Sequence, residues 1–457
     1  MADVAAIFKA YDVRGLVPAQ LDRSVSRAVG AAFAVEVSTG GAPSGVVVGH
    51  DMRESSPSLA DAFSDGVRDA GADVVLIGLA STDELYLASG LLDLPGAMFT
   101  ASHNPAAYNG IKMCRPGAVP MAAMTGLNAI RDAVVEARLP PAASSAARGG
   151  LERRPMLEEY VAHLHALVPV VGRTLTVVVD AANGMAGLTT PAVLGGLSNV
   201  DIVPMYFELD GTFPNHEANP LDPANLRDLQ ARVVHEGADL GLAFDGDADR
   251  CFVVDELGQL VPPSALTALI AVRALAEEPG ARVVHNLISS RAVPELIEQH
   301  GGIPVRTPVG HSLIKATMAR ERAIFGGEHS GHYYFRDFWY ADSGMLAAMH
   351  MLAAVAEGAT PVSELMSGFT PYAGSGEVNL EVTDVEQVLA AVESRYSGQE
   401  DVRLDHLDGL TVAGPMWWFN VRPSNTEPLV RLNVEAESRS MMTDVRDRVL
   451  SLMRSEV

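Results

Sequence analysis

Three times along the chain, short apolar runs, several of them rich in valine, alternate with helical stretches, and the last run of each unit leads into a polar loop. The three loops read FTASHNP (residues 99–105), FDGDADR (244–250) and GEHSGH (327–332). Valine-rich runs separated by helical segments are typical of buried, mostly parallel strands in α/β domains. The repeat therefore predicts three similar tandem α/β domains with mixed, largely parallel sheets.

The last part of the chain has a different pattern. After residue 367, runs such as VNLEVT (378–383) and WWFNVRP (417–423) indicate a smaller α+β domain. A Pro/Ala/Ser-rich stretch at 139–150 is typical of a linker. A chain of 457 residues is also too long for a single compact core. We predict four domains, at residues 1–143, 150–255, 256–367 and 368–457.

The position of the polar loops predicts where a site should lie. Ligands of open α/β sheets bind at the carboxyl ends of the strands. Each of the three loops directly follows a predicted strand, so we expect all three to face one central cleft.

Composition excludes several classes of function. The formal net charge of −24 disfavours nucleic acid and anionic membranes as partners, because the average field repels both. Two cysteines are too few for a disulfide framework or a thiolate metal site, and no apolar window approaches the length of a membrane span. We expect a soluble, cytoplasmic protein. Only three of its 33 basic residues are lysines, Lys9, Lys112 and Lys315, which is a hint of a chemical role for them, although chance codon usage explains each one equally well.

The first loop raises the question of whether Ser102 is a nucleophile. Asn-Pro is a common turn dipeptide, so an ordinary turn explains TASHNP (100–105) as well as a nucleophile does. A serine hydroxyl needs a base or a metal to become a useful nucleophile. The adjacent His103 points the other way if the segment is extended, so we expect help from elsewhere in the chain.

The second loop carries Asp245, Asp247 and Asp249 at alternate positions. Three close carboxylates repel one another unless a hard cation neutralises them. An EF-hand is excluded because Arg250 stands where its sharp turn requires glycine. A haloacid-dehalogenase-type phosphatase with Asp245 as the nucleophile and a solvated acidic turn stay as alternatives. A magnesium site completed by a substrate phosphate suits the loop best.

Two further loops carry groups suited to a phosphosugar. Glu328, Ser330 and His332 could bind vicinal hydroxyls, although a glycine-rich turn with incidental polar groups is the alternative. RPSNTEP (422–428) has the guanidinium, hydroxyl, amide and turn N–H groups of a phosphate cradle, or else of an Asx/ST turn. His311, in TPVGHSLIK, could transfer a proton, although a lone histidine is more often structural.

These four motifs, in this order over four domains, closely resemble the α-D-phosphohexomutase family. The resemblance extends from IFKAYDVRG (7–15) to RPSNTEPLVRL (422–432). It is closest to the bacterial phosphomannomutase/phosphoglucomutase branch, because the sugar loop ends in His332 and the phosphate loop reads RPSNTEP. It implies an isomerase that converts mannose 6-phosphate to mannose 1-phosphate, and also glucose phosphates, through a phosphoserine and a hexose 1,6-bisphosphate. A phosphoglucosamine mutase and a non-catalytic sugar-phosphate-binding regulator are the alternatives on the same scaffold.

The resemblance also implies a role for each candidate residue. Ser102 would carry the phosphoryl group and bind Mg²⁺ together with Asp245, Asp247 and Asp249. Lys112 and His311 are the candidates for general acid and base, with Arg14 beside the phosphoserine. The expected substrate-binding residues are Arg250, Glu328, Ser330, His332, Arg422, Ser424, Asn425 and Thr426.

Further expectations follow from the family. Glucose or mannose 1,6-bisphosphate would act as the activator, and the partners would be the 1- and 6-phosphates of mannose and glucose. The protein would be a monomer or a small homo-oligomer. The sequence departs from the family at Ile288, where some relatives carry a lysine, so one cationic contact to the substrate is not expected here.

Overall fold

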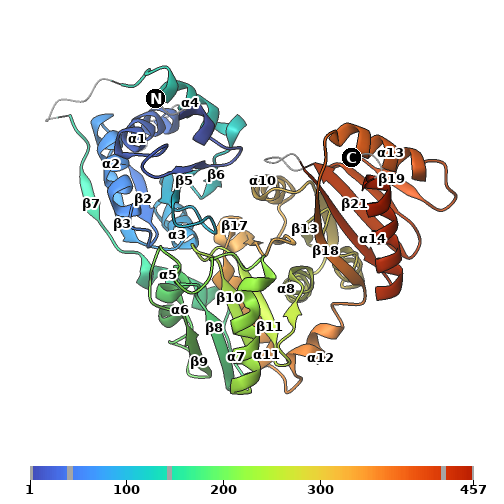
Figure 1. Cartoon of the computed structure of the whole chain (residues 1–457). Coiled ribbons are helices and arrows are strands. Elements are labelled where there is room, and N and C mark those ends of the chain that lie inside the picture. The colour runs from blue at the N-terminus through green and yellow to red at the C-terminus, as the bar shows by residue number, and fades with distance from the viewer. Residues whose placement is uncertain (1–3, 39–44, 141–146, 424–428, 455–457) are drawn as a thin grey trace.

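The computed structural model describes residues 4–38, 45–140, 147–423 and 429–454, with the side chains of His311 and Ser312 left out. These residues form four sheets that follow one another along the chain. Figure 1 shows the first domain in blue and the fourth in red on opposite sides of the molecule, with the second and third between them. The predicted fold class, three tandem α/β domains and a C-terminal α+β domain, is confirmed.

The first sheet has the order β1-β5-β4-β2-β3-β7, with β6 paired to β5. Neighbours are parallel from β4 to β7, and β5 is antiparallel to each of its partners. Its strands are β1 (Val13–Leu16), β2 (Val46–His50), β3 (Val74–Leu79), β4 (Gly96–Phe99), β5 (Tyr108–Arg115), β6 (Val119–Pro120) and β7 (Leu151–Arg153). The helices are η1 (Val4–Ile7), α1 (Arg23–Ser38), α2 (Ser56–Asp69), α3 (Thr82–Leu92), η2 (Ala123–Thr125) and α4 (Leu127–Val135).

The second sheet has the order β12-β11-β10-β8-β9, parallel from β10 to β9 and antiparallel from β12 to β10. Its strands are β8 (Leu175–Asp180), β9 (Val200–Met205), β10 (Leu240–Phe244), β11 (Cys251–Asp255) and β12 (Leu260–Val261). The helices are α5 (Leu157–Leu167), α6 (Ala186–Val193), η3 (Pro223–Leu226) and α7 (Arg227–Glu236).

The third sheet repeats this layout in the order β14-β13-β15-β16-β17, parallel from β14 to β15 and antiparallel beyond. Its strands are β13 (Arg282–Asn286), β14 (Ile303–Thr307), β15 (Phe325–Gly327), β16 (Tyr333–Phe335) and β17 (Ala341–Asp342). The helices are α8 (Pro263–Glu277), α9 (Ala292–Gln299), α10 (His311–Glu321), η4 (Arg336–Phe338), α11 (Gly344–Ala356) and α12 (Val362–Ser367).

The fourth sheet is antiparallel throughout, in the order β18-β22-β21-β20-β19. Its strands are β18 (Ala373–Glu381), β19 (Arg403–Asp405), β20 (Leu410–Ala413), β21 (Trp417–Pro423) and β22 (Leu429–Ala436). The helices are α13 (Val385–Tyr396) and α14 (Arg439–Arg454).

The first three sheets share one feature that positions the site. In each, the last parallel strand continues through a polar loop into an antiparallel neighbour, as β4 does into β5, β10 into β11 and β15 into β16. These connections are the three loops that the sequence singled out. Because the neighbours pair side by side, each loop is a short connection at the carboxyl end of a buried strand.

The exact domain boundaries stay predictions, but two short strands cross them. β7 pairs with β3, so the first sheet takes in residues that we assigned to the second domain. β12 pairs with β11, so the second sheet extends beyond residue 255. Both strands are only two or three residues long, and their pairing depends on tertiary contacts that no local pattern records.

The buried apolar residues are divided unequally among the domains. The largest core cluster joins the first three domains and includes Val47, Tyr160 and Met345. The fourth domain has its own core, around Phe419 and Val449. The first three domains are thus held together by continuous apolar packing, and the buried members of that cluster in the described part of the chain all come from these three domains.

Candidate active site

Ser102 lies in the loop after β4, is 1 % exposed and has a φ of 50°. Its Oγ donates a hydrogen bond of 2.7 Å to Oδ2 of Asp245, so the first and second loops meet. His103 does not point away from it. The positive φ turns the backbone out of the extended conformation, and His103 Nδ1 lies 3.3 Å from Ser102 Oγ. The expectation based on an extended segment was therefore wrong.

Arg53 holds the serine loop, the connection between β4 and β5 at residues 100–107 that carries Ser102. The sequence analysis did not identify Arg53. Its guanidinium is buried, and Asp51 lies 3.2 Å away. It donates hydrogen bonds of 2.7–3.0 Å to the carbonyl oxygens of Ser102, Asn104, Pro105 and Tyr108. The available signal was the pair of charged residues in GHDMR, directly after a buried strand.

The three aspartates of the second loop meet in the interior. Asp245, Asp247 and Asp249 are at most 1 % exposed, and one oxygen of each lies within 4.8 Å of the others. Burial and repulsion from the other two raise the pKa of Asp245 well above its usual value. Burial and Asp247 raise the pKa of Asp249 to about 6. Burial acts on Asp247 too, but Lys112 and hydrogen bonds outweigh it, so the pKa of Asp247 is lowered.

Lys112, on β5, supplies the cation between these carboxylates. Its Nζ lies 2.7 Å from Asp247 Oδ2 and 2.5 Å from Asp249 Oδ2. Burial alone lowers the pKa of Lys112, but the two aspartates raise it further than burial lowers it. An ammonium group held in its charged form can offset the charge of a phosphate, but it is a poor general base near neutral pH.

The donor set fits a hard divalent cation. Oδ1 of Asp247 and Oδ1 of Asp249 are buried and have no hydrogen-bond partner in the described part of the chain. Mg²⁺ prefers carboxylate oxygens together with a hydroxyl or phosphate oxygen. Ser102, Asp245, Asp247 and Asp249 together offer these ligands.

Arg14, on β1, lies against the serine loop. Its Nη1 donates to the carbonyl oxygen of Ala101 at 2.9 Å and to the side chain of Asn104. Its Nε donates to Oδ2 of Asp12 at 2.8 Å. Arg14 therefore contacts residues on either side of Ser102, and its role beside a phosphoserine stays a prediction.

The sugar loop lies between β15 and β16, at residues 328–332. It contacts the acidic loop, which lies between β10 and β11 at residues 245–250 and carries the three aspartates. Ser330 Oγ lies 2.9 Å from His332 Nδ1, and Tyr334 Oη donates to Glu328 Oε2 at 2.8 Å. Burial raises the pKa of Glu328. The backbones of Arg250 and His332 form a β-bridge, and Arg250 Nε donates to His332 Nε2 at 3.3 Å. The predicted sugar-binding side chains thus stand beside the predicted metal site.

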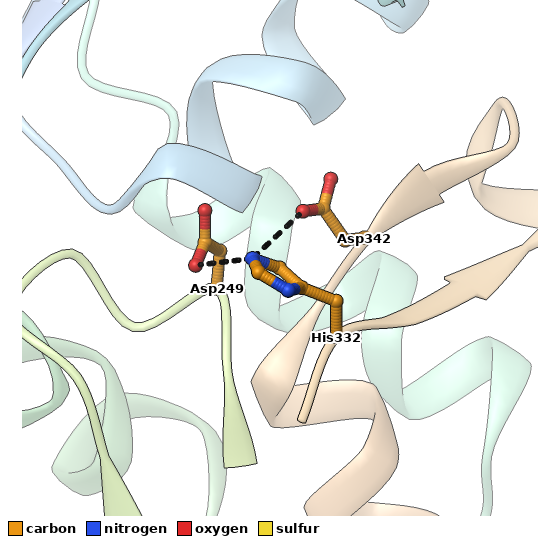
Figure 2. A group of neighbouring side chains, drawn as sticks. All are labelled: Asp249, His332 and Asp342. Carbon is orange, nitrogen blue, oxygen red and sulfur yellow. Dashed lines mark ion pairs between the residues drawn. The ribbon is translucent and has the colours of Figure 1, made fainter. Parts of the chain in front are cut away.

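Figure 2 shows His332 beside two carboxylates, Asp249 of the acidic loop and Asp342 of β17 (Ala341–Asp342). Its Nε2 lies 3.6 Å from Asp249 Oδ1 and 4.0 Å from Asp342 Oδ2. Asp342, on β17, is a further residue that the sequence analysis missed. Its Oδ1 lies 2.5 Å from Nζ of the buried Lys315, which in turn lies over the ring of Tyr86 at 4.0 Å. Lys315 therefore balances a buried carboxylate behind the sugar loop.

The fourth domain contributes one described candidate. Arg422, on β21, is 5 % exposed and donates to Glu377 at 2.7 Å. Ser424, Asn425 and Thr426 lie outside the described residues, as does the side chain of His311. Their roles stay predictions.

Ile288, where some relatives carry a lysine, lies between the third and fourth domains. It is 6 % exposed and forms a small apolar cluster with Leu287 and Trp418. Trp418 Nε1 donates to Glu435 at 2.8 Å, and the same carboxylate accepts from the backbone N of Arg291 at 3.0 Å. An apolar side chain at this position supports a contact between the domains.

Comparison with known families agrees with this arrangement. Models of the phosphoglucomutase/phosphomannomutase α/β/α domains I, II and III match residues 5–138, 158–258 and 262–372, and the model of the C-terminal domain matches residues 377–452. The chain therefore belongs to the phosphoglucomutase/phosphomannomutase family, and the resemblance stated from the sequence is confirmed.

Relatives match over nearly their whole length. The chain is 41 % identical to a protein of Xanthomonas campestris pv. campestris named "Phosphohexose mutases", covering 97 % of this chain and 98 % of the relative. It is 37 % identical to the phosphomannomutase of Salmonella montevideo, covering 98 % and 99 %. The chain is 34 % identical to a phosphoglucomutase/phosphomannomutase family protein from Burkholderia thailandensis whose crystal structure it matches with a TM-score of 0.89, covering 98 % of both chains.

Every helix in the described parts of the chain is too short or too polar to cross a membrane.

Proposed function

We propose that the chain interconverts mannose 6-phosphate and mannose 1-phosphate, and that it also accepts the glucose phosphates. The observation that carries this proposal is the 2.7 Å contact of Ser102 Oγ with Asp245, in a loop of three buried aspartates. The names of two relatives support the choice of sugar. One is the phosphomannomutase of Salmonella montevideo, and the other, 35 % identical, is the phosphomannomutase/phosphoglucomutase of Pseudomonas syringae pv. tomato.

In this proposal Ser102 carries the phosphoryl group. Its P–O bond to Oγ breaks as a P–O bond to a sugar hydroxyl forms, and the hydroxyl proton passes to a base. The resulting hexose 1,6-bisphosphate turns around and returns its other phosphoryl group to Ser102. Bound Mg²⁺ would offset the charge that develops on the transferred group. Added glucose or mannose 1,6-bisphosphate would load a serine that lacks phosphate.

The cations around Ser102 have separate tasks in this scheme. Lys112 and Arg14 stabilise phosphate charge, and the raised pKa of Lys112 argues against a role as the base. Arg250 Nε donates to His332 Nε2, so the lone pair on that atom is already engaged by a cation and His332 is not favoured as the base. His311 stays a candidate from the sequence.

The remaining candidates would bind the sugar and the distal phosphate. Glu328 and Ser330 would hold sugar hydroxyls, since both lie beside His332 at the sugar loop. Arg250 would contact the substrate from the acidic loop. The distal phosphate would be bound in the fourth domain by Arg422, Ser424, Asn425 and Thr426.

The decisive experiment is to incubate the protein with Mg²⁺ and glucose 1,6-bisphosphate and to map stable phosphate by peptide mass spectrometry. We expect phosphate on Ser102, and no mannose phosphate interconversion by Ser102→Ala. The matched control is Ser363→Ala, because Ser363 also hydrogen-bonds a carboxylate, that of Glu256, but lies outside the site. Near-normal turnover by Ser102→Ala would refute the proposal.

The same experiment distinguishes the mutase from the phosphatase alternative. A nucleophilic Asp245 would form an acyl phosphate, which hydroxylamine cleaves, whereas phosphoserine resists hydroxylamine. Assays with glucosamine 6-phosphate beside mannose 6-phosphate separate the phosphoglucosamine mutase alternative. A protein that binds these sugars tightly and interconverts none of them would be the non-catalytic regulator.

A further inference from the structure

The first turn of helix α3, in the first domain, is hydrogen-bonded to the acidic loop of the second domain. Thr82 Oγ1 donates to Asp247 Oδ2 at 2.6 Å, and the backbone N of Thr82 donates to the carbonyl oxygen of Asp247 at 3.1 Å. Thr82 and Asp247 are fully buried. Neither the sequence motifs nor the function proposed above uses Thr82.

The neighbouring residue, Asp83, joins this turn to the other domains. Asp83 Oδ2 accepts from Tyr160 Oη of α5 at 2.7 Å and from Ser343 Oγ at 2.6 Å, where Ser343 is the N-cap of α11. Its Oδ1 accepts from Ser81, the N-cap of α3. Burial raises the pKa of Asp83 to about 6, against the lowering effect of these hydroxyl groups. One buried carboxylate therefore receives donors from all three domains that share the main core.

We propose that Asp83 is a positioning residue, which clamps the first turn of α3 between the second and third domains so that Thr82 holds Asp247 in the orientation that a metal ion requires. The proposal rests on the metal site proposed above and adds two residues that act on it from outside.

The contacts of Asp247 support this role. Its Oδ2 accepts from both Thr82 and Lys112, whereas its Oδ1 is buried without a hydrogen-bond partner in the described part of the chain. A carboxylate fixed through one oxygen presents the other in a single direction. Groups that orient a metal ligand in this way contribute substantially to metal affinity.

The same clamp reaches the sugar loop. Ser343, which donates to Asp83, directly follows Asp342, and Asp342 lies opposite His332 (Figure 2). Thr82, which binds the acidic loop, directly precedes Asp83. The contacts of Asp83 therefore link the metal ligands with the sugar-binding residues, in addition to the direct contact between Arg250 and His332.

Stability alone is a weak explanation for this arrangement. A carboxylate at 0 % exposure loses its hydration, and apolar side chains could join three helices at lower cost. Unlike apolar contacts, hydrogen bonds to a carboxylate fix the orientation of the groups that they join.

Direct Mn²⁺ binding to the full chain, measured by electron paramagnetic resonance, tests the proposal without relying on turnover. We expect Thr82→Val to raise the Mn²⁺ Kd about tenfold and Asp83→Ala about fivefold. The conservative variant Thr82→Ser should stay within about threefold of the wild type, because it retains the hydroxyl donor. Asp83→Asn keeps the shape but replaces one acceptor oxygen by an NH2 donor, so it should weaken Mn²⁺ binding, though less than Asp83→Ala does. The matched control is again Ser363→Ala, which removes a serine–carboxylate contact far from the acidic loop.

The outcomes are distinguishable. Should Thr82→Val and Asp83→Ala bind Mn²⁺ within twofold of the wild type, whatever their melting temperatures, the positioning role is overturned. Should the wild type itself not bind Mn²⁺, the proposed metal site fails first and this inference with it. If Asp83→Ala does not fold, Tyr160→Phe removes only one donor to Asp83 and should still weaken binding measurably.

Discussion

Replacing Lys112 by methionine tests the electrostatics of the site most directly. The ammonium group lies 2.7 Å from Asp247 and 2.5 Å from Asp249, and its side chain is 16 % exposed. Without it, Arg250 remains 3.5 Å from Asp245, and Arg14 and Arg53 still attract Asp247 from farther away. Removing one partner of a buried ion pair typically costs about 3–5 kcal/mol, because the other charge is left uncompensated.

The cost should depend on pH. Asp249, whose pKa is already raised to about 6, can take up a proton when Lys112 is absent, and this relieves the repulsion. We therefore expect a loss of about 3 kcal/mol at pH 8 and a clearly smaller loss at pH 6. At about 2–4 °C for each kcal/mol, the first unfolding transition at pH 8 should fall by roughly 6–12 °C.

The variant should be stabilised by Mg²⁺ more strongly than the wild type is, although it is less stable without metal. In the wild type, Lys112 Nζ competes with a divalent cation for the oxygens of Asp247 and Asp249. Lys112→Met should therefore gain more thermal stability from saturating Mg²⁺ than the wild type gains, although its kcat falls. Calorimetry with and without Mg²⁺ measures the melting temperature of each variant and the increase that Mg²⁺ produces.

Lys315→Met is the matched control, because Lys315 also pairs with a buried carboxylate, that of Asp342, outside the acidic loop. It should lower the melting temperature and leave the Mg²⁺ shift unchanged. If Lys112→Met were as stable as the wild type without metal, or gained no more from Mg²⁺, the electrostatic reasoning would be refuted.

Three further predictions concern other parts of the site. Arg53→Met removes four hydrogen bonds to the serine loop, so kcat should fall at least about tenfold with little change in KM, as a coupled mutase assay would show. Because Asp245 and Asp249 have raised pKa values and must be ionised to bind a metal, Mg²⁺ binding should release protons and weaken as the pH falls towards and below about 6. Titration calorimetry in two buffers of different ionisation enthalpy checks this. Ile288→Ala removes a side chain that packs on Trp418, so it should cost about 2 kcal/mol and increase hydrogen exchange in β21.

The sequence was most informative where structure depends on local patterns. Valine-rich runs are buried because each strand is covered on both faces, and they marked β2 and β8 well. The loops after β4, β10 and β15 were recognisable because polar residues directly followed short apolar runs. Their convergence followed from the rule that ligands bind at the carboxyl ends of strands.

Contacts between residues far apart along the chain could not be predicted in this way. Asp83 and Asp342 lie in unremarkable local sequence, and their partners Ser343 and Lys315 are distant along the chain. Which hydroxyl meets Asp83 depends on how α3, α5 and α11 pack against one another. The orientation of His103 depended on a single backbone angle at Ser102, which the extended pattern of the preceding strand did not reveal.

The distribution of core residues bears on how a bisphosphate can turn around without being lost. Ser102, the aspartates and the sugar loop all belong to domains that share one apolar core, and Asp83 adds a polar clamp to it. These groups therefore form a rigid unit. Arg422 belongs to a domain with a separate core, joined to the third domain through the small cluster of Ile288 and Trp418. The fourth domain is therefore attached to this unit through a much smaller apolar cluster than the one that joins the first three domains, and Ile288 is part of it.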